Sequence, residues 1–269
     1  IISKERELGM KRLTIGLLAA VAGLVLAGCS QRSTLTDGKF IVGFDAEFPP
    51  YGFKDGTEYK GFDLDLAREV CKRRGWEFVA CPINWDAKDM QLSSSKIDCI
   101  WNGFTMQGRE ENYTWSPAYV DNSQVVIVKV GSPIRMLADL AGRTVAVQTD
   151  TPVQKALMAG GDREALGKTF KELRTTADYN SAVMALESGA VDAVALDIGV
   201  AKKKMSDMPG KFTQLDEIVM TETYGIGFRK GNDALRDQVV ETLREMVKDG
   251  TAAKISAKWF DGKDVITLR

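Results

Sequence analysis

The chain has 269 residues, of which 44% are hydrophobic and 27% are charged, and its formal net charge is −1. This length allows two modest folded lobes, and this balance excludes a disordered chain and a polyanion-binding surface. The chain contains no histidine, which excludes histidine-dependent catalytic triads, and none of its four cysteines form a C-x-x-C pair typical of zinc or redox sites.

The N-terminal region has the order of signals found in exported proteins. Two basic residues precede an apolar run over residues 13–26, which is shorter than the about 20 residues that a membrane-spanning helix needs. The run ends in Leu-Ala-Gly-Cys, which resembles the cleavage site of bacterial lipoproteins and implies that Cys29 becomes the lipidated first residue. We therefore expect a signal peptide over residues 10–29 and a polar linker over residues 30–36. A chance cysteine after an ordinary signal peptide, or a buried helix, is the alternative.

The next part of the chain alternates strand and helix patterns. The predicted strands are residues 39–44, 76–81 and 97–101, and the predicted helices are residues 63–74 and 89–94. Asp63 can cap the first helix and Gly75 can end it in the left-handed conformation. Cys71 lies on an apolar helix face and Cys99 in an apolar strand, so with Cys81 we expect free, mostly buried thiols.

A second set of elements follows the same order. The predicted strands are residues 144–148, 170–173, 191–196 and 224–228, and the predicted helices are residues 153–158, 181–188, 234–249 and 254–259. Strand, helix, strand in succession favours parallel strands with helices covering them. The sequence thus predicts the α/β class with two lobes on one chain.

A series of ordered motifs resembles the polar amino-acid binding proteins of ABC importers, which are solute-binding proteins of family 3. The motifs are residues 43–53 (GFDAEFPPYGF), 61–66 (GFDLDL), 98–109 (DCIWNGFTMQGR), 145–151 (VAVQTDT), 191–197 (VDAVALD), 224–228 (YGIGF) and 258–260 (KWF). The resemblance covers residues 39–260 and implies a two-lobed periplasmic-binding-protein type 2 fold. Each lobe would be a mostly parallel sheet covered by helices.

The same resemblance implies how the chain is divided between the lobes. The first lobe would combine residues 37–130 with residues 222–269, and the second would be residues 131–221. The two crossovers between lobes would lie near residues 129–132 and residues 220–223. Ligand sites prefer such clefts between domains, and closure around a ligand is a known motion of this class.

A free amino acid is a zwitterion, and both of its charges need partners when it is buried. Arg109 is our candidate for the α-carboxylate because a guanidinium pairs with a carboxylate through two parallel hydrogen bonds. Asp197 is our candidate for the α-ammonium group. Without the resemblance, Arg109 would be a solvated surface charge and Asp197 a helix cap.

Further site residues are implied by the resemblance alone. Phe48 and Trp85 match the aromatic walls of the family site, and Asp45 would face the far end of the ligand. The alternatives without ligand binding are core packing for the two rings and a turn for Asp45. The remaining contacts would come from Asn102, Gly103, Thr105, Gln148 and Thr151. Pro152 has no N–H where the family often donates one to the carboxylate, so this bond is either absent or replaced by the Thr151 hydroxyl.

The resemblance implies an extracytoplasmic binding protein, anchored to the membrane by lipid, that passes a polar or cationic amino acid to an ABC permease and ATPase. We expect the ligand to have a polar or cationic side chain, because Asp45 can pair with such a group and the two aromatic rings can cover the stem that carries it. We expect a monomer that is not an enzyme and binds no metal, cofactor or nucleic acid. The alternatives are a sensing or scavenging lipoprotein without a transporter, and a dehydratase-like enzyme on the same fold.

Overall fold

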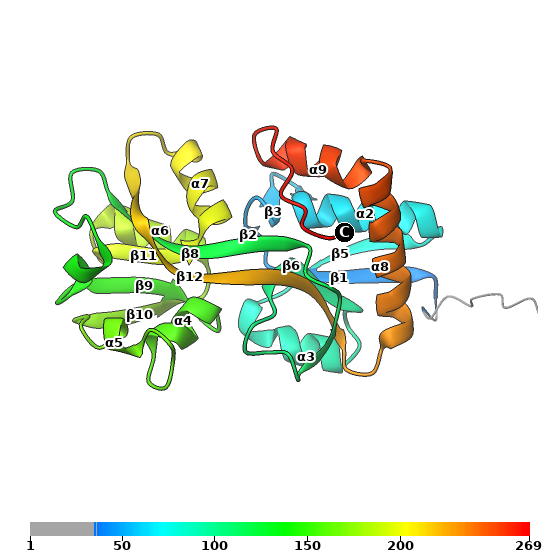
Figure 1. Cartoon of the computed structure of the whole chain (residues 1–269), viewed down its shortest axis with the longest axis horizontal. Helices are drawn as coiled ribbons and strands as arrows, with labels where there is room; N and C mark the ends of the chain where they lie inside the picture. Colours follow the sequence, from blue (N-terminus) through cyan, green and yellow to red (C-terminus); the bar gives the residue numbers. More distant parts are fainter. Residues whose placement is uncertain (1–34, 36) are drawn as a thin grey trace, which may run out of the picture. The chain divides into compact units, whose positions relative to one another are not determined.

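A computed structural model describes residue 35 and residues 37–269, and Figure 1 shows its arrangement. The predicted signal peptide, the predicted lipidation site Cys29 and all of the predicted linker except Leu35 lie outside these residues. Leu35, which the sequence assigns to the linker, is buried against the core. None of the helices in the described part is long and apolar enough to cross a membrane.

The main sheet has nine strands in the order β10-β9-β11-β8-β12-β6-β1-β5, with β7 also paired to β12. A separate three-stranded sheet has the order β2-β3-β4. The strands are β1 (Lys39–Phe44), β2 (Glu47–Phe48), β3 (Gly52–Asp55), β4 (Glu58–Lys60), β5 (Glu77–Pro82), β6 (Cys99–Thr105), β7 (Tyr113–Trp115), β8 (Val120–Lys129), β9 (Thr144–Gln148), β10 (Glu172–Thr176), β11 (Ala193–Asp197) and β12 (Phe212–Arg229).

Two groups of parallel strands are joined by two long antiparallel strands. The group β5-β1-β6 is parallel, as is the group β10-β9-β11. Between them, β8 and β12 pair with each other from Phe212 beside Lys129 to Tyr224 beside Val120. We call the part with β1, β5, β6 and β7 the first half and the part with β9, β10 and β11 the second half; β8 and β12 run through both (Figure 1).

Helices cover both groups of strands. The helices are α2 (Phe62–Arg74), α3 (Lys88–Ser93), α4 (Pro152–Leu157), α5 (Glu164–Gly167), α6 (Tyr179–Ser188), α7 (Ile198–Asp207), α8 (Asp233–Lys248) and α9 (Thr251–Trp259). In the second half, α4 and α5 lie on one side of the strands and α6 and α7 on the other (Figure 1). Val145 and Val147 pack in one core cluster while Ala146 packs in another, because successive side chains of a strand point to opposite faces. This burial on both faces explains why β9 and β11 read as continuous apolar runs.

The first predicted helix forms, but Asp63 does not cap it. Helix α2 begins at Phe62 after Gly61 and ends at Arg74, followed by Gly75, which has the left-handed φ of 69°. The Asp63 side chain is fully buried and accepts hydrogen bonds from the Gly103 amide (2.6 Å) and the Tyr119 hydroxyl (2.8 Å). Asp63 therefore ties α2 to strand β6 and does not satisfy the amides of its own helix.

The sheet register bears on the expected crossover near residues 129–132. Residues Gln124 to Val128 of β8 pair with β11, which belongs to the second half. The chain has thus reached the second half before residue 129, so the earlier residues of β8 make the connection. At the return, Tyr224 pairs with Thr105 of β6 and marks the arrival of β12 in the first half.

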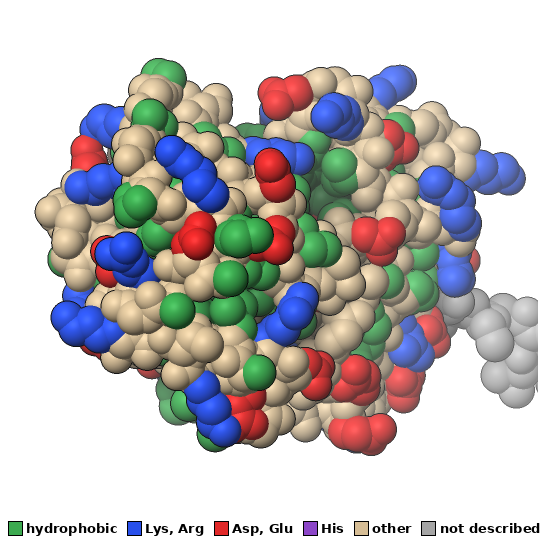
Figure 2. All heavy atoms as spheres, turned by 60° about the vertical axis from the view of Figure 1, so that its left-hand side comes forward, with side chains coloured by type: hydrophobic (Ala, Val, Ile, Leu, Met, Phe, Trp, Pro, Cys, Tyr) green, Lys and Arg blue, Asp and Glu red, His purple; other side chains and the backbone are tan. Residues whose placement is uncertain are grey.

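The three described cysteines are free, and Cys71 and Cys99 are buried as expected. Burial raises the pKa of the Cys71 thiol to about 12 and that of Cys99 well above its usual value, so both stay protonated at neutral pH. Both therefore act as small apolar core residues. On the face shown in Figure 2, basic and acidic side chains both occur, which agrees with a net charge near zero.

Candidate functional site

A small cavity is lined by side chains from both halves of the sheet. Its volume is about 20 Å³, which is room for roughly one water molecule. A free amino acid is several times larger, so the halves would have to separate to admit one. The lining residues are Phe48, Trp85, Asn102, Gly103, Thr105, Arg109, Gln148, Thr151, Pro152 and Asp197. The structure thus brings together every residue predicted for ligand binding except Asp45.

Arg109 is a buried cation in the turn after β6, with only 4% of its surface exposed. Its guanidinium lies 5.0 Å from the centroid of the Phe104 ring. It donates hydrogen bonds to the carbonyl oxygens of Thr105 (3.3 Å) and Asp150 (2.6 Å). Because Asp150 lies in the turn after β9, the second bond crosses between the halves. This burial contradicts the alternative that Arg109 is a solvated surface charge.

Asp197 is a buried carboxylate at the carboxyl end of β11, 3% exposed. It occupies the cap position of α7, yet its side chain makes no capping hydrogen bond. Instead it accepts from the Asn122 amide (2.8 Å) and from the Tyr224 hydroxyl. Burial raises the pKa of Asp197. The helix-cap alternative is thus correct for the position of Asp197 but wrong for what its carboxylate contacts.

Phe48 and Gly103 form one wall of the cavity together. The Phe48 ring packs 5.5 Å from Tyr51 and 5.9 Å from Tyr179, the latter on α6 of the second half. Gly103 has a left-handed φ of +53°, and a Cβ at this position would lie 2.8 Å from the Phe48 ring. Glycine is therefore required for Phe48 to pack here. The Gly103 amide already donates to Asp63, so this N–H is not free for a ligand.

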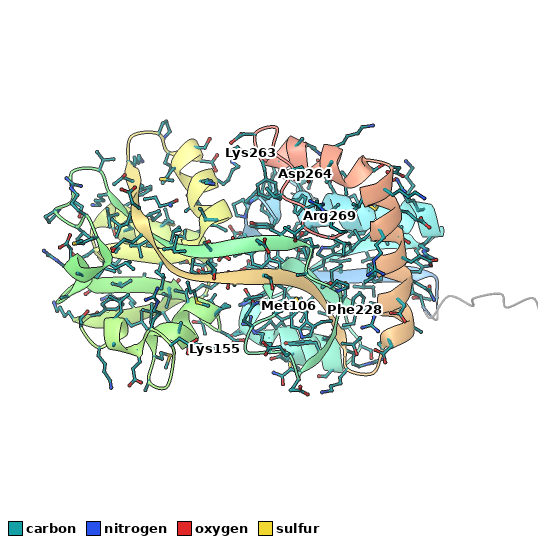
Figure 3. All side chains as sticks on the ribbon, in the orientation of Figure 1. Met106, Lys155, Phe228, Lys263, Asp264 and Arg269 are labelled. Carbon is teal, nitrogen blue, oxygen red and sulfur yellow. The ribbon has the colours of Figure 1, made fainter. Side chains whose placement is uncertain are left out.

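Trp85 also lines the cavity, and the Lys88 side chain beside it forms an ion pair that the sequence did not predict. Its ring meets Phe104 edge to face, and the Lys88 ammonium lies 5.1 Å from its centroid. Lys88 is 1% exposed and pairs with the Asp150 carboxylate of the second half. Burial lowers the pKa of Lys88, while Asp150 opposes this effect. Lys155 on α4, labelled in Figure 3, pairs with the same carboxylate at 2.9 Å.

Asp45 lies beside the cavity and joins the halves by its own hydrogen bond. Its carboxylate accepts hydrogen bonds from the Glu47 amide (2.8 Å) and from the Gln148 side chain across the cleft (2.6 Å). The first bond is the one expected if Asp45 only stabilises a turn. Burial raises the pKa of Asp45. A groove of about 520 Å³ opens next to it, with four carboxylates among its lining residues: Asp45, Glu47, Asp86 and Asp178. Among the described residues that line this groove, none is lysine or arginine.

The predicted polar groups differ in how far they are already engaged. The Asn102 oxygen accepts from the Asp45 amide (2.9 Å), while its Nδ2 is buried without a partner in the described structure. The Thr105 hydroxyl donates to Glu222 (3.0 Å). A buried donor without a partner costs free energy. The Asn102 amide is therefore the donor best placed to gain from a ligand.

The Thr151 hydroxyl is already engaged in hydrogen bonds at the start of α4. It donates to the Gln148 carbonyl (2.7 Å) and accepts from the Gln154 amide (3.4 Å), which caps α4. Pro152 is the first residue of this helix, where a missing N–H costs nothing. In this structure the Thr151 proton is thus not free to replace the N–H that Pro152 lacks.

The sequence also missed a polar cluster behind Asp197. Glu222 of β12 is 3% exposed and accepts from the side chains of Asn122 (2.6 Å) and Gln124 (2.7 Å) of β8. The one sequence feature that could have indicated this cluster is the polar run Thr-Glu-Thr before the predicted strand at residues 224–228. A single glutamate among polar residues is usually exposed, so the run gave no reason to expect a buried acid.

Comparison with known proteins gives a consistent result. The sequence pattern that defines the "Bacterial extracellular solute-binding proteins, family 3" matches residues 40–262. The L-cystine-binding protein TcyJ of Escherichia coli (strain K12) is 28% identical over 97% of this chain and 99% of its own length. The arginine-binding extracellular protein ArtP of Bacillus subtilis (strain 168) is 28% identical over 94% of this chain and 100% of its own length.

Among solved structures, an ABC uptake transporter substrate binding protein from Streptococcus pneumoniae with bound histidine is similar to this fold. The TM-score is 0.81 at 30% sequence identity, covering 86% of this chain and 95% of that one. The α/β fold expected from the sequence is therefore confirmed.

Proposed function

The chain belongs to the bacterial extracellular solute-binding proteins, family 3, and on this basis we propose that it captures a free amino acid between two lobes for an ABC importer. Three similar proteins are described as binding L-cystine, arginine or histidine, and none of these descriptions names an enzyme. The chain is accordingly a binding protein that acts outside the cytoplasm.

One observation carries the proposal: a buried guanidinium and a buried carboxylate, from different halves, line the same cavity. Arg109 would bind the α-carboxylate through its planar fork, and Asp197 would bind the α-ammonium group. Each charge is 4% exposed or less, so each loses hydration and gains from an opposite charge. A zwitterion satisfies both at once, whereas a simple anion or cation satisfies only one.

Binding would proceed by opening and closure of the two lobes. The 20 Å³ cavity is too small for an amino acid, so the closed arrangement must open first. The connections would be the middle parts of β8 and β12, the two strands that run through both halves. Because the proposed ligand contacts come from both lobes, the ligand would bind the closed form more tightly and shift the population toward it.

The ligand side chain would be cationic or polar. Asp45 lines the groove of about 520 Å³, and carboxylates dominate the charged lining of that groove. Such a surface attracts cations and repels anions during approach. Phe48 and Trp85 would cover the apolar stem of a long side chain. We therefore infer that L-arginine is preferred over acidic amino acids.

A lipid anchor would keep the protein beside its permease. The motif ending in Cys29 supports this proposal, together with the polar segment that separates it from the folded body. Incorporation of labelled palmitate into the wild-type chain, and its loss in Cys29→Ala, is the expected result. A wild-type chain that gains no label would contradict the anchor without touching the binding proposal.

A melting-temperature screen of the purified protein against single amino acids tests the ligand proposal. A ligand at about 100 times its dissociation constant stabilises the folded state by about 2.7 kcal/mol, which for a domain of this size raises Tm by about 5–10 °C. We expect L-arginine to give such a shift and L-glutamate none. If no amino acid shifts Tm, the proposed function is wrong.

A further inference from the structure

Asp197 does not stand alone at the end of the cavity proposed for the α-ammonium group. Glu222 lies directly behind it, and one side-chain amide joins the two acids. The Asn122 Nδ2 donates to Asp197 at 2.8 Å and to Glu222 at 2.6 Å. Both acids are 3% exposed, and in the described residues neither forms an ion pair with lysine or arginine. Two uncompensated negative charges this close and this deeply buried are unfavourable.

The surroundings of the pair contain buried acceptors that have no partner in the described structure. The carbonyl oxygens of the Asn122 and Gln124 side chains are buried without a partner in the described structure. The Thr105 and Tyr224 hydroxyls already donate, the first to Glu222 and the second to Asp197. A cluster of acceptors without a matching cation calls for a proton or for a cationic ligand group.

The tyrosine hydroxyl groups near the pair do not titrate near neutral pH. Burial raises the pKa of Tyr51, Tyr179 and Tyr224 well above the usual value, so all three stay neutral. Burial and the charge of Asp197 raise the pKa of Glu222 to about 8. Burial raises the pKa of Asp197 as well. Two buried carboxyl groups that share one amide donor are more stable with a proton on one of them, because the proton removes one of the two like charges.

The pair also spans a wall of the protein. Asp197 lines the small inner cavity, whereas Glu222 and Asn122 line a groove of about 540 Å³ on the face formed by β8 and β12. Glu222 can therefore exchange a proton with water in this groove while the inner cavity stays closed.

We propose that Glu222 and Asp197 hold one shared proton in the ligand-free protein, and that the α-ammonium group of a bound amino acid displaces it. The inference rests on the proposed function and adds a residue to it: Glu222 positions and charges Asp197. The O–H bond of the carboxyl group breaks and the proton passes to water or buffer. The Asp197 carboxylate then faces the ammonium group, with the Glu222 carboxylate behind it. Binding of an amino acid thus releases one proton near neutral pH.

Titration calorimetry with L-arginine tests this directly. Measured at pH 7 in two buffers that differ in ionisation enthalpy, the wild-type protein should release close to one proton per ligand. Dissociation constants should fall about tenfold from pH 6 to pH 7, because one bound proton is lost per ligand bound. L-arginine does not titrate appreciably in this interval. Glu222→Gln should release far less than one proton and should lose the pH dependence. Glu245→Gln, on the exposed side of α8, is the matched control and should behave as wild type.

A second measurement needs no ligand. Glu222 with a pKa of about 8 stabilises the folded state fully below the ordinary glutamate pKa, and this contribution is lost as pH rises through 8. The Tm of the wild-type protein should therefore fall relative to that of Glu222→Gln between pH 5 and pH 8. If parallel Tm profiles are found, or if a wild-type protein that binds L-arginine releases no proton, the inference is overturned while the binding proposal stands. If no amino acid binds, the binding proposal fails and the Tm profiles still decide on the shared proton.

Discussion

Replacement of Arg109 by alanine is the sharpest test of the proposed binding mode. Loss of one partner of a buried, hydrogen-bonded charge pair costs about 2–5 kcal/mol of binding free energy, which raises Kd about 30-fold to several thousand-fold. Arg109 is 4% exposed and stacks on Phe104, so the upper part of this range is expected. Arg109→Lys keeps the charge but loses the planar fork, and its Kd should lie between those of wild type and Arg109→Ala.

The fold should survive this change. Arg109 bonds two carbonyl oxygens, of which Asp150 is only partly buried, so water can replace one donor. We expect the free energy of unfolding to fall by about 1–3 kcal/mol and Tm by a few degrees. Arg244→Ala, on the exposed face of α8, is the control for loss of a guanidinium. Calorimetry and thermal melting check both quantities, and an unchanged Kd in a folded Arg109→Ala would refute the assigned role.

Three further substitutions test separate parts of the site. Gly103→Ala should lower the free energy of unfolding by about 2 kcal/mol because of its φ of +53° and the Phe48 ring 2.8 Å away; a Tm unchanged by melting would contradict this packing. Asp45→Asn should reduce the preference for L-arginine over the neutral L-citrulline about tenfold, and an equal Kd ratio in wild type and variant would argue against Asp45 as the side-chain receptor. Lys88→Met removes the ion pair with Asp150, so small-angle scattering should show a larger radius of gyration without ligand and the wild-type value with saturating L-arginine. A ligand-free radius equal to wild type would show that this pair does not hold the halves together.

Much of the fold could be predicted because many elements carry local signals. Strand β9 has the predicted bounds, and α2 ends at Arg74, just before Gly75, as expected from its basic last turn and the glycine. Strand β8 was missed, and β12 was expected only from Tyr224 onward although it begins at Phe212. Asn122 and Gln124 of β8 and Glu222 of β12 are buried and bond one another instead of facing solvent. Their pattern is therefore set by tertiary contacts, which a local periodicity cannot show.

The site was predicted from the resemblance more than from chemistry. Taken alone, Arg109 and Asp197 had better structural explanations, and it is the fold that buries them in one cavity. The ion pair of Lys88 and Asp150 joins residues far apart in sequence, and Glu222 becomes notable only beside Asp197. Such pairings depend on which strand ends meet, so no spacing in the chain reveals them.

The Arg109 guanidinium already donates a hydrogen bond to the Asp150 carbonyl oxygen at 2.6 Å. A ligand group must therefore compete with this backbone oxygen for the guanidinium. An incoming molecule gains at this end only by offering something better than a neutral oxygen. A full negative charge does so, whereas the amide, ester or decarboxylated analogue of the same amino acid exchanges one neutral contact for another or for none. In the proposed binding mode, amines and blocked amino acids would therefore bind more weakly than free amino acids, whatever their side chain.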